Sequence, residues 1–121
     1  MKRVYFASAS KGSRKLAEIY VDILSLNHFV FAPTLGFRGT ETLQIRGSIM
    51  EVCFHLVCGW ADVVVALNEG VKTEGVWEEL ILAELQAVPS CLFSPFGKAV
   101  HYHQAYEVEK FKDVLKWVNE L

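Results

Sequence analysis

The chain has 121 residues, of which 52% are hydrophobic, and this length and composition suit one globular domain with a substantial core. Its formal net charge of −2 gives no bulk reason to expect nucleic-acid binding, although a local site can still bind a small phosphorylated ligand. No apolar run approaches the roughly 18 residues that span a bilayer, and the opening MKRVYFASAS is too short and too strand-like for a signal peptide, so we expect a cytoplasmic protein.

The first half of the chain alternates between strand-like and helix-like segments. Three segments are rich in β-branched, aromatic or continuous apolar residues, as is typical of strands: 3–8, 28–33 and 62–67. Apolar residues recur at helical spacing in the two segments between them: 13–26 and 43–60. Ser13 is a favourable N-cap for the first of these helices.

The second half continues this alternation. The adjacent Glu78 and Glu79 open a helix after a glycine-bounded loop, and a short buried strand follows at 90–93. Residues 99–106 alternate as in a last strand, and 107–121 form the clearest amphipathic helix. Such alternation predicts one domain over residues 1–121, an α/β three-layer sandwich with a mostly parallel sheet of four or five strands, flavodoxin-like or Rossmann-like.

The cysteines and histidines give no sign of a metal or redox site. The chain has an odd number of cysteines, and they lie in apolar surroundings without CxxC spacing: Cys53, Cys58 and Cys91. We therefore expect three reduced, buried thiols. His101 and His103 share one face if their segment is a strand, which permits metal binding, but a half-exposed strand explains them more simply. We expect no metal and no cofactor.

Two loops at the carboxyl ends of the predicted strands draw attention, because ligands bind at this edge of such sheets. The first loop, 8–14, has small residues with Lys11 and Arg14, and it leads into a helix whose first N–H groups favour an anion. A phosphate site is one interpretation of this loop. An ordinary turn with solvated basic residues is the other.

The second loop leads to Glu78 and Glu79. Both are compatible with a simple preference for acidic residues near a helix N-terminus. Neighbours on a helix are about 100° apart, so Glu79 lies beside Ala83, whereas Glu78 points between Leu82 and Leu85. Glu79 is therefore the carboxylate that we expect to face the end of the sheet.

Several short motifs occur together in a familiar order. The strand VYFAS, the basic turn KGSR, the segment ADVVVAL and the pattern G-V-W-E-E-L-x-x-A-x-x-x-x-x-P resemble the nucleoside 2-deoxyribosyltransferase-like superfamily, which includes nucleoside monophosphate N-glycosidases. The resemblance covers about residues 2–95, and Gly75, Glu79, Ala83 and Pro89 fall on positions of the family pattern.

The resemblance implies specific roles. Glu79 matches the nucleophile that attacks the anomeric carbon, giving a glycosyl-enzyme intermediate that water or a second base resolves. Tyr5 matches a tyrosine that orients this glutamate. The implied substrate-binding residues lie on the turn after the first strand, which holds a 5′-phosphate in the monophosphate glycosidases, and near the glutamate helix: Ser10, Lys11, Gly12, Ser13, Arg14, Thr73 and Gly75.

The sequence departs from the family in one catalytic position. The active enzymes carry a sugar-contacting aspartate on the second helix, at a position close to Phe54 here. Glu51, one turn earlier, is the replacement acid that we consider, with His55 as its neighbour, while Trp77 stands where relatives have a small residue. The sequence thus predicts a deoxyribosyltransferase or N-glycosidase, or alternatively a non-catalytic nucleotide-binding or sensing module. The resemblance also implies a small nucleoside or nucleotide ligand and a homodimer or higher homo-oligomer.

Overall fold

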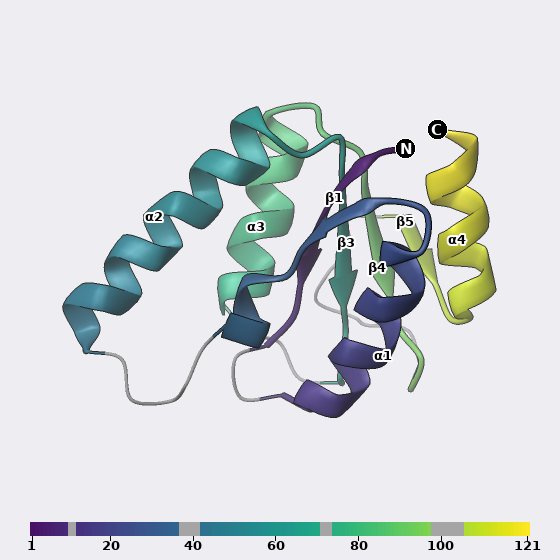
Figure 1. Cartoon of the computed structure of the whole chain (residues 1–121), viewed down its shortest axis with the longest axis horizontal. Coiled ribbons are helices and arrows are strands. Elements are labelled where there is room, and N and C mark those ends of the chain that lie inside the picture. The colour runs from purple at the N-terminus through teal and green to yellow at the C-terminus, as the bar shows by residue number, and fades with distance from the viewer. Residues whose placement is uncertain (10–11, 37–41, 71–73, 98–105) are drawn as a thin grey trace.

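A computed structural model describes the whole chain except residues 10–11, 37–41, 71–73 and 98–105 (Figure 1). Its described residues form a five-stranded sheet between two layers of helices. The strands are β1 (Arg3–Ala7), β2 (Phe29–Phe31), β3 (Val63–Leu67), β4 (Ser90–Phe93) and β5 (Tyr106–Val108). The helices are α1 (Arg14–Ser25), α2 (Leu43–Gly59), α3 (Glu74–Leu85) and α4 (Phe111–Glu120), with a 3₁₀ turn at Pro33–Gly36.

All neighbouring strands run parallel, in the order β2-β1-β3-β4-β5. The predicted α/β sandwich of the flavodoxin type is therefore confirmed. The chain moves outward from β1 to β2 and then returns to place β3 on the other side of β1. This reversal of strand order puts the expected ligand crevice beyond the carboxyl ends of β1 and β3.

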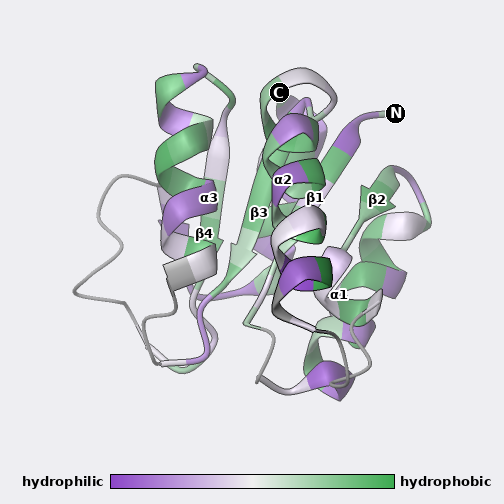
Figure 2. Ribbon diagram, turned by 90° about the vertical axis from the view of Figure 1, so that its left-hand side faces the viewer, coloured by the Kyte–Doolittle hydropathy of each residue, from purple (hydrophilic) through white to green (hydrophobic). Residues whose placement is uncertain are grey.

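The sheet is covered on both faces because its central strands carry apolar side chains on both sides. Val4 and Phe6 of β1 pack with α1 and α4, while Tyr5 and Ala7 pack with α2 and α3. Every residue of β3 is buried, and the strand is hydrophobic along its length (Figure 2). We call the layer that contains Tyr5, α2 and α3 the α2/α3 face.

Local signals explain two of the helix ends. Ser13 caps α1, since its hydroxyl accepts a hydrogen bond from the Leu16 N–H at 3.2 Å, as predicted. α3 ends in a Schellman motif in which the Val88 N–H donates to the Ala83 carbonyl and Ala87 adopts a positive φ of 55°.

The beginning of α3 differs from the prediction. The helix begins at Glu74 and not at the paired glutamates, so Glu78 and Glu79 lie in its second turn. The helix dipole stabilises charges mainly in the first turn, and capping therefore does not account for these two residues.

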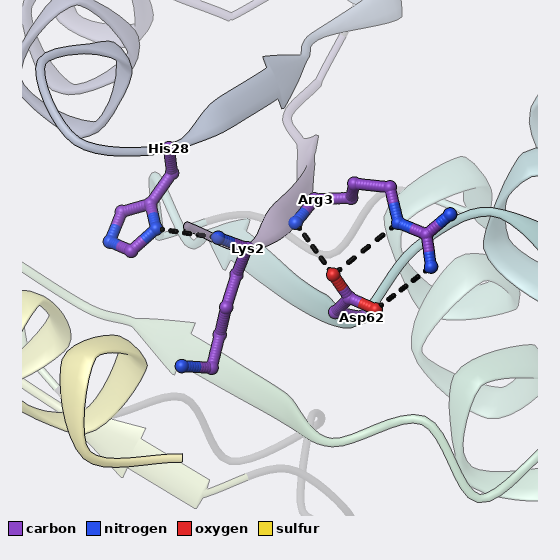
Figure 3. A network of polar contacts seen from close by, with 4 residues as sticks. All are labelled: Lys2, Arg3, His28 and Asp62. Carbon is purple, nitrogen blue, oxygen red and sulfur yellow. Dashed lines mark hydrogen bonds and ion pairs between the residues drawn. The ribbon is translucent and has the colours of Figure 1, made fainter.

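Polar contacts tie the amino ends of the strands together (Figure 3). Asp62 accepts hydrogen bonds from the backbone N–H of Arg3 at 2.8 Å and from its guanidinium at 3.1 Å, which joins the start of β1 to the start of β3 and lowers the pKa of Asp62. His28 accepts from the Lys2 N–H through Nδ1 and contacts Asn119 of α4 through Nε2. This network lies at the edge of the sheet opposite the expected crevice.

Other sequence-based expectations need correction. The described part of the last strand is Tyr106–Val108, so strand structure continues beyond the predicted end at residue 106. α4 begins at Phe111 and not at residue 107, because the backbone there first pairs with β4. Residues 98–105 lie outside the described part of the chain. Cys53 and Cys91 are buried as predicted, but Cys58 is exposed because it lies on the outer side of α2.

Two further findings concern the described residues only. No helix in them is long and apolar enough to cross a membrane. No group of three or more histidine, cysteine or acidic side chains in them is arranged to hold a metal ion, and His101 and His103 fall outside this part of the chain.

Candidate functional site

Glu79 is a buried carboxylic acid on the α2/α3 face. Its side chain is only 9% exposed, whereas the neighbouring Glu78 is exposed. Val76 and Ala83, three residues before and four after Glu79, are both buried in the same layer. The prediction that the two glutamates point in different directions is therefore confirmed: Glu79 is buried and Glu78 is exposed.

Burial gives Glu79 unusual acid–base properties. Removal of water from around the carboxyl raises its pKa from 4.5 to about 8, because the charged form loses its hydration. Its Oε2 atom is buried and has no hydrogen-bond partner among the described residues. A buried carboxyl with an unsatisfied oxygen is uncommon, and such groups are concentrated at functional sites.

Tyr5 is a second buried polar group with an open hydrogen-bonding position. Its side chain is fully buried, and its ring lies 6.0 Å from that of Phe31 in the neighbouring strand. The hydroxyl has no partner in the described part of the structure, so no hydrogen bond joins it to Glu79. Both residues nevertheless lie on the same face of the sheet.

The turn after β1 encloses a small polar cavity of about 50 Å³. Its walls come from the turn, the start of α1 and the 3₁₀ segment: Ser8, Ala9, Gly12, Ser13, Arg14, Ala17, Thr34 and Leu35. Thr34 donates a hydrogen bond to the Ser8 carbonyl at 2.8 Å, which fixes the turn against that segment. The predicted residues Gly12, Ser13 and Arg14 do line one cavity, while Ser10 and Lys11 lie outside the described residues.

Arg14 is engaged by groups of the protein itself. Its guanidinium forms an ion pair with Glu18 at 3.1 Å, one helical turn away, and donates a hydrogen bond to the Leu35 carbonyl. These contacts hold the arginine across the rim of the turn.

Sequence reasoning missed Glu69. Its Oε1 accepts a hydrogen bond from the backbone N–H of Ser13 at 2.8 Å, so the loop after β3 reaches the first turn of α1. Asn68 fixes this loop: its Oδ1 accepts from the Gly70 N–H at 2.9 Å, and its Nδ2 donates to Ser94 at 3.1 Å. The Asn-x-Gly pattern directly after a buried strand was a usable signal, because asparagine favours such turns and Gly70 has a φ of +94°.

An open apolar groove of about 490 Å³ lies beside α2, within the size range of small-ligand pockets. It is lined by Phe31 and by residues of α2, both exposed and buried: Gln44, Ile45, Ser48, Ile49, Val52 and Cys53. Through Phe31 it adjoins the ring of Tyr5.

Comparison with solved structures gives a clear result. A 2-deoxyribosyltransferase from the psychrotolerant bacterium Bacillus psychrosaccharolyticus matches with a TM-score of 0.72 and 22% identity, over 93% of this chain and 89% of that chain. The chain has the fold of a 2-deoxyribosyltransferase. The Clostridium botulinum CMP N-glycosidase BcmB matches with a TM-score of 0.55 and 12% identity, over 98% of both chains. No protein-family model matches the chain, and no curated protein matches it by sequence.

At these identities the likeness establishes the fold, and at that level the resemblance predicted from the sequence is confirmed. The roles of individual residues on this 2-deoxyribosyltransferase fold stay predictions. The structure adds only the positions of these side chains.

The remaining predicted residues are less closely associated with Glu79. Glu51 is exposed on α2. It lies two residues from the buried Cys53, which is roughly 200° around the helix, so it points away from the buried side of α2. Gly75 is exposed in the first turn of α3, and Thr73 lies outside the described residues. Trp77 is half-buried and packs against the core of the α2/α3 face.

Proposed function

We propose that this protein cleaves the bond between base and sugar in a nucleoside or nucleotide, as a deoxyribosyltransferase or N-glycosidase with Glu79 as the nucleophile. The observation that carries the proposal is the buried Glu79 carboxyl, whose Oε2 is unsatisfied, in the same layer as the unsatisfied hydroxyl of Tyr5. Two structural neighbours, named as a 2-deoxyribosyltransferase and a CMP N-glycosidase, support it through the shared fold.

The chemistry follows from the properties of a buried carboxylate. A Glu79 oxygen bonds to the anomeric carbon while the bond from that carbon to the base nitrogen breaks, and the base leaves with the bonding electrons and takes up a proton. Water then attacks the same carbon and releases the sugar, or a second base attacks and gives a new nucleoside, and either step restores the Glu79 carboxylate.

The protonation state of Glu79 sets a condition on this reaction. A pKa of about 8 means that the free protein holds Glu79 mainly protonated at neutral pH, and only the ionised form is a nucleophile. We propose that Tyr5 donates a hydrogen bond to Glu79 when substrate is bound. A donor to the charged form lowers the pKa of a carboxyl group, and positive charge developing on the sugar acts in the same direction.

A non-catalytic nucleotide-binding or sensing module is the second candidate. The exposed position of Glu51 favours it, because the acid that we consider as a replacement for the family aspartate does not lie on the buried side of α2. A protein that retained the pocket but lacked this acid would bind nucleotides without cleaving them.

One assay separates the two candidates. The protein is incubated with a panel of deoxynucleosides, ribonucleosides and their 5′-monophosphates, and free base is measured by chromatography. An enzyme releases base, and Glu79→Gln abolishes the release while the control Glu78→Gln, a neighbouring exposed glutamate, does not. Saturable binding without release identifies the sensing module. Absence of both binding and release contradicts both candidates.

We also propose assembly as a homodimer or larger homo-oligomer. Ile45, Met50 and Val52 of α2 are 49%, 41% and 55% exposed, and a second copy is a means of covering them. Light scattering of the wild type and of Val52→Asp tests this: the proposal requires a mass above that of one chain and a smaller mass for the variant.

A further inference from the structure

The amino end of α1 is already occupied by a carboxylate of the protein. Backbone N–H groups in the first turn of a helix are favourable ligands for an anion. Here the Ser13 N–H donates to Glu69 Oε1 at 2.8 Å. A Cβ added to Gly12 would lie 1.8 Å from Glu69 Oε2, so the glycine lets the carboxylate sit directly against the turn.

The loop that carries Glu69 is fixed on both sides of that residue. Before it, the buried Asn68 donates from Nδ2 to Ser94, whose hydroxyl in turn donates to Glu107 at 2.6 Å. After it, the Gly70 N–H donates to Asn68 Oδ1. The position of Glu69 is therefore set by a network that crosses the ends of β3, β4 and β5.

Two buried oxygens, one in the turn after β1 and one in the loop after β3, have unused hydrogen-bonding capacity. Ser8 lines the cavity, is 7% exposed, and its Oγ has no partner among the described residues. Glu69 Oε2 is also buried and without a partner in that part of the chain. A carboxylate only accepts hydrogen bonds, whereas a serine hydroxyl both donates and accepts. Glu69 Oε2 therefore needs a ligand group that donates a hydrogen bond, as a sugar hydroxyl does.

A phosphate group does not satisfy Glu69 Oε2. Its second pKa is about 6, so above neutral pH it is a dianion without a proton to donate to Glu69. Two negative groups at one helix end also repel each other. The guanidinium of Arg14, at the rim of the cavity, is held by Glu18 and by the Leu35 carbonyl.

We propose that Glu69 determines the specificity of this site: it accepts a hydrogen bond from the terminal hydroxyl of a nucleoside sugar and rejects the corresponding 5′-monophosphate. The proposal rests on the proposed function for the identity of the ligand. It assigns to this turn the opposite preference from the 5′-phosphate site that the family resemblance implies.

The first experiment uses inorganic phosphate alone and does not depend on nucleoside chemistry. Binding is measured by calorimetry in a phosphate-free buffer at about pH 8, where the ligand is a dianion. Glu69→Gln removes the charge and keeps the shape, and Glu69→Ala also opens the space. Glu120→Gln, at the end of α4, is the control for net charge. We expect no saturable binding to the wild type or the control, and saturable binding to both Glu69 variants.

The second experiment measures the ratio of affinities for a deoxynucleoside and its 5′-monophosphate. The wild type should favour the nucleoside, and Glu69→Gln should shift the ratio toward the monophosphate by about tenfold or more. Thermal unfolding confirms that each variant is folded, and the isosteric glutamine keeps the test valid if the alanine variant is not.

The outcomes separate this proposal from the proposed function. If no variant binds or cleaves any nucleoside, the proposed function fails and the phosphate titration alone decides the role of Glu69. Phosphate binding to the wild type as tight as to the Glu69 variants, or equal gains in the charge control that indicate an adventitious ion only, would overturn the proposal. So would a wild type that prefers the monophosphate.

Discussion

The raised pKa of Glu79 predicts that this one residue makes the protein less stable as the pH rises. The perturbation is Glu79→Gln, which keeps the size of the side chain and removes its titration. Between pH 4.5 and about 8 the folded protein holds a proton on Glu79 that the unfolded chain has released. The free energy of unfolding therefore falls as the pH rises through this window, and the loss is complete above the folded-state pKa.

The magnitude follows from the two pKa values. Each unit of difference corresponds to about 1.4 kcal/mol, so the shift from 4.5 to about 8 gives a total of about 5 kcal/mol. About 4 kcal/mol of this falls between about pH 5 and pH 9. This is a large part of the stability of a typical small domain, which is about 5–15 kcal/mol.

Urea denaturation of the wild type and Glu79→Gln across this pH range measures the effect. All other titrating groups are common to the two proteins, so the difference between their curves isolates Glu79. Glu78→Gln is the matched control, because Glu78 is exposed one residue away. The stability of the wild type should fall relative to Glu79→Gln by about 4 kcal/mol, whereas Glu78→Gln should follow the wild type. Parallel curves for the wild type and Glu79→Gln would refute the argument, since they would mean that Glu79 ionises as freely in the folded protein as in the unfolded chain.

Three further predictions concern stability and thiol reactivity. Ala87→Gly should raise the free energy of unfolding by about 1 kcal/mol, because Ala87 holds a left-handed conformation at φ 55° that glycine adopts without strain; urea denaturation that shows no gain would contradict this backbone geometry. Gly47→Ala should also stabilise by about 1 kcal/mol, since Gly47 is exposed within α2 and an added Cβ meets nothing within 4 Å; a loss in the same assay would indicate that the position is covered in solution. A disulfide reagent should modify Cys58 rapidly and the buried Cys53 and Cys91 only on unfolding, because burial raises the pKa of both thiols, that of Cys91 to about 12. Cys58→Ser should abolish the rapid phase, and its persistence would contradict this assignment.

The fold could be predicted from the sequence because its strongest signals are local. The continuous apolar run of β3 indicated a strand covered on both faces, and Ser13 marked the start of α1. The predicted start of α3 was wrong because acidic residues favour the first turn of a helix, which pointed to Glu78 and Glu79, whereas the helix begins at Glu74. In α2 apolar residues occur on nearly every side, so their spacing did not show that Cys53 is buried and Cys58 exposed.

The candidate site could be predicted only in part, for a different physical reason. Helix geometry was sufficient to separate Glu79 from Glu78, because both lie on one element. The contact between Glu69 and Ser13 joins residues 56 positions apart on two different loops. Such a contact depends on the strand order of the sheet, in which β1 and β3 are neighbours, and no local pattern in the sequence contains that information.

The histidine that joins the first strand to the last helix has a practical consequence. His28 contacts the backbone of Lys2 and the side chain of Asn119, so residues near the two ends of this chain are held within reach of one imidazole ring (Figure 1). They lie at the amino edge of the sheet. A tag or a tether attached at either end therefore emerges from the side that is away from the cavity and the Glu69 loop. Protein immobilised through such a tag should present its candidate ligand site outward to the solution.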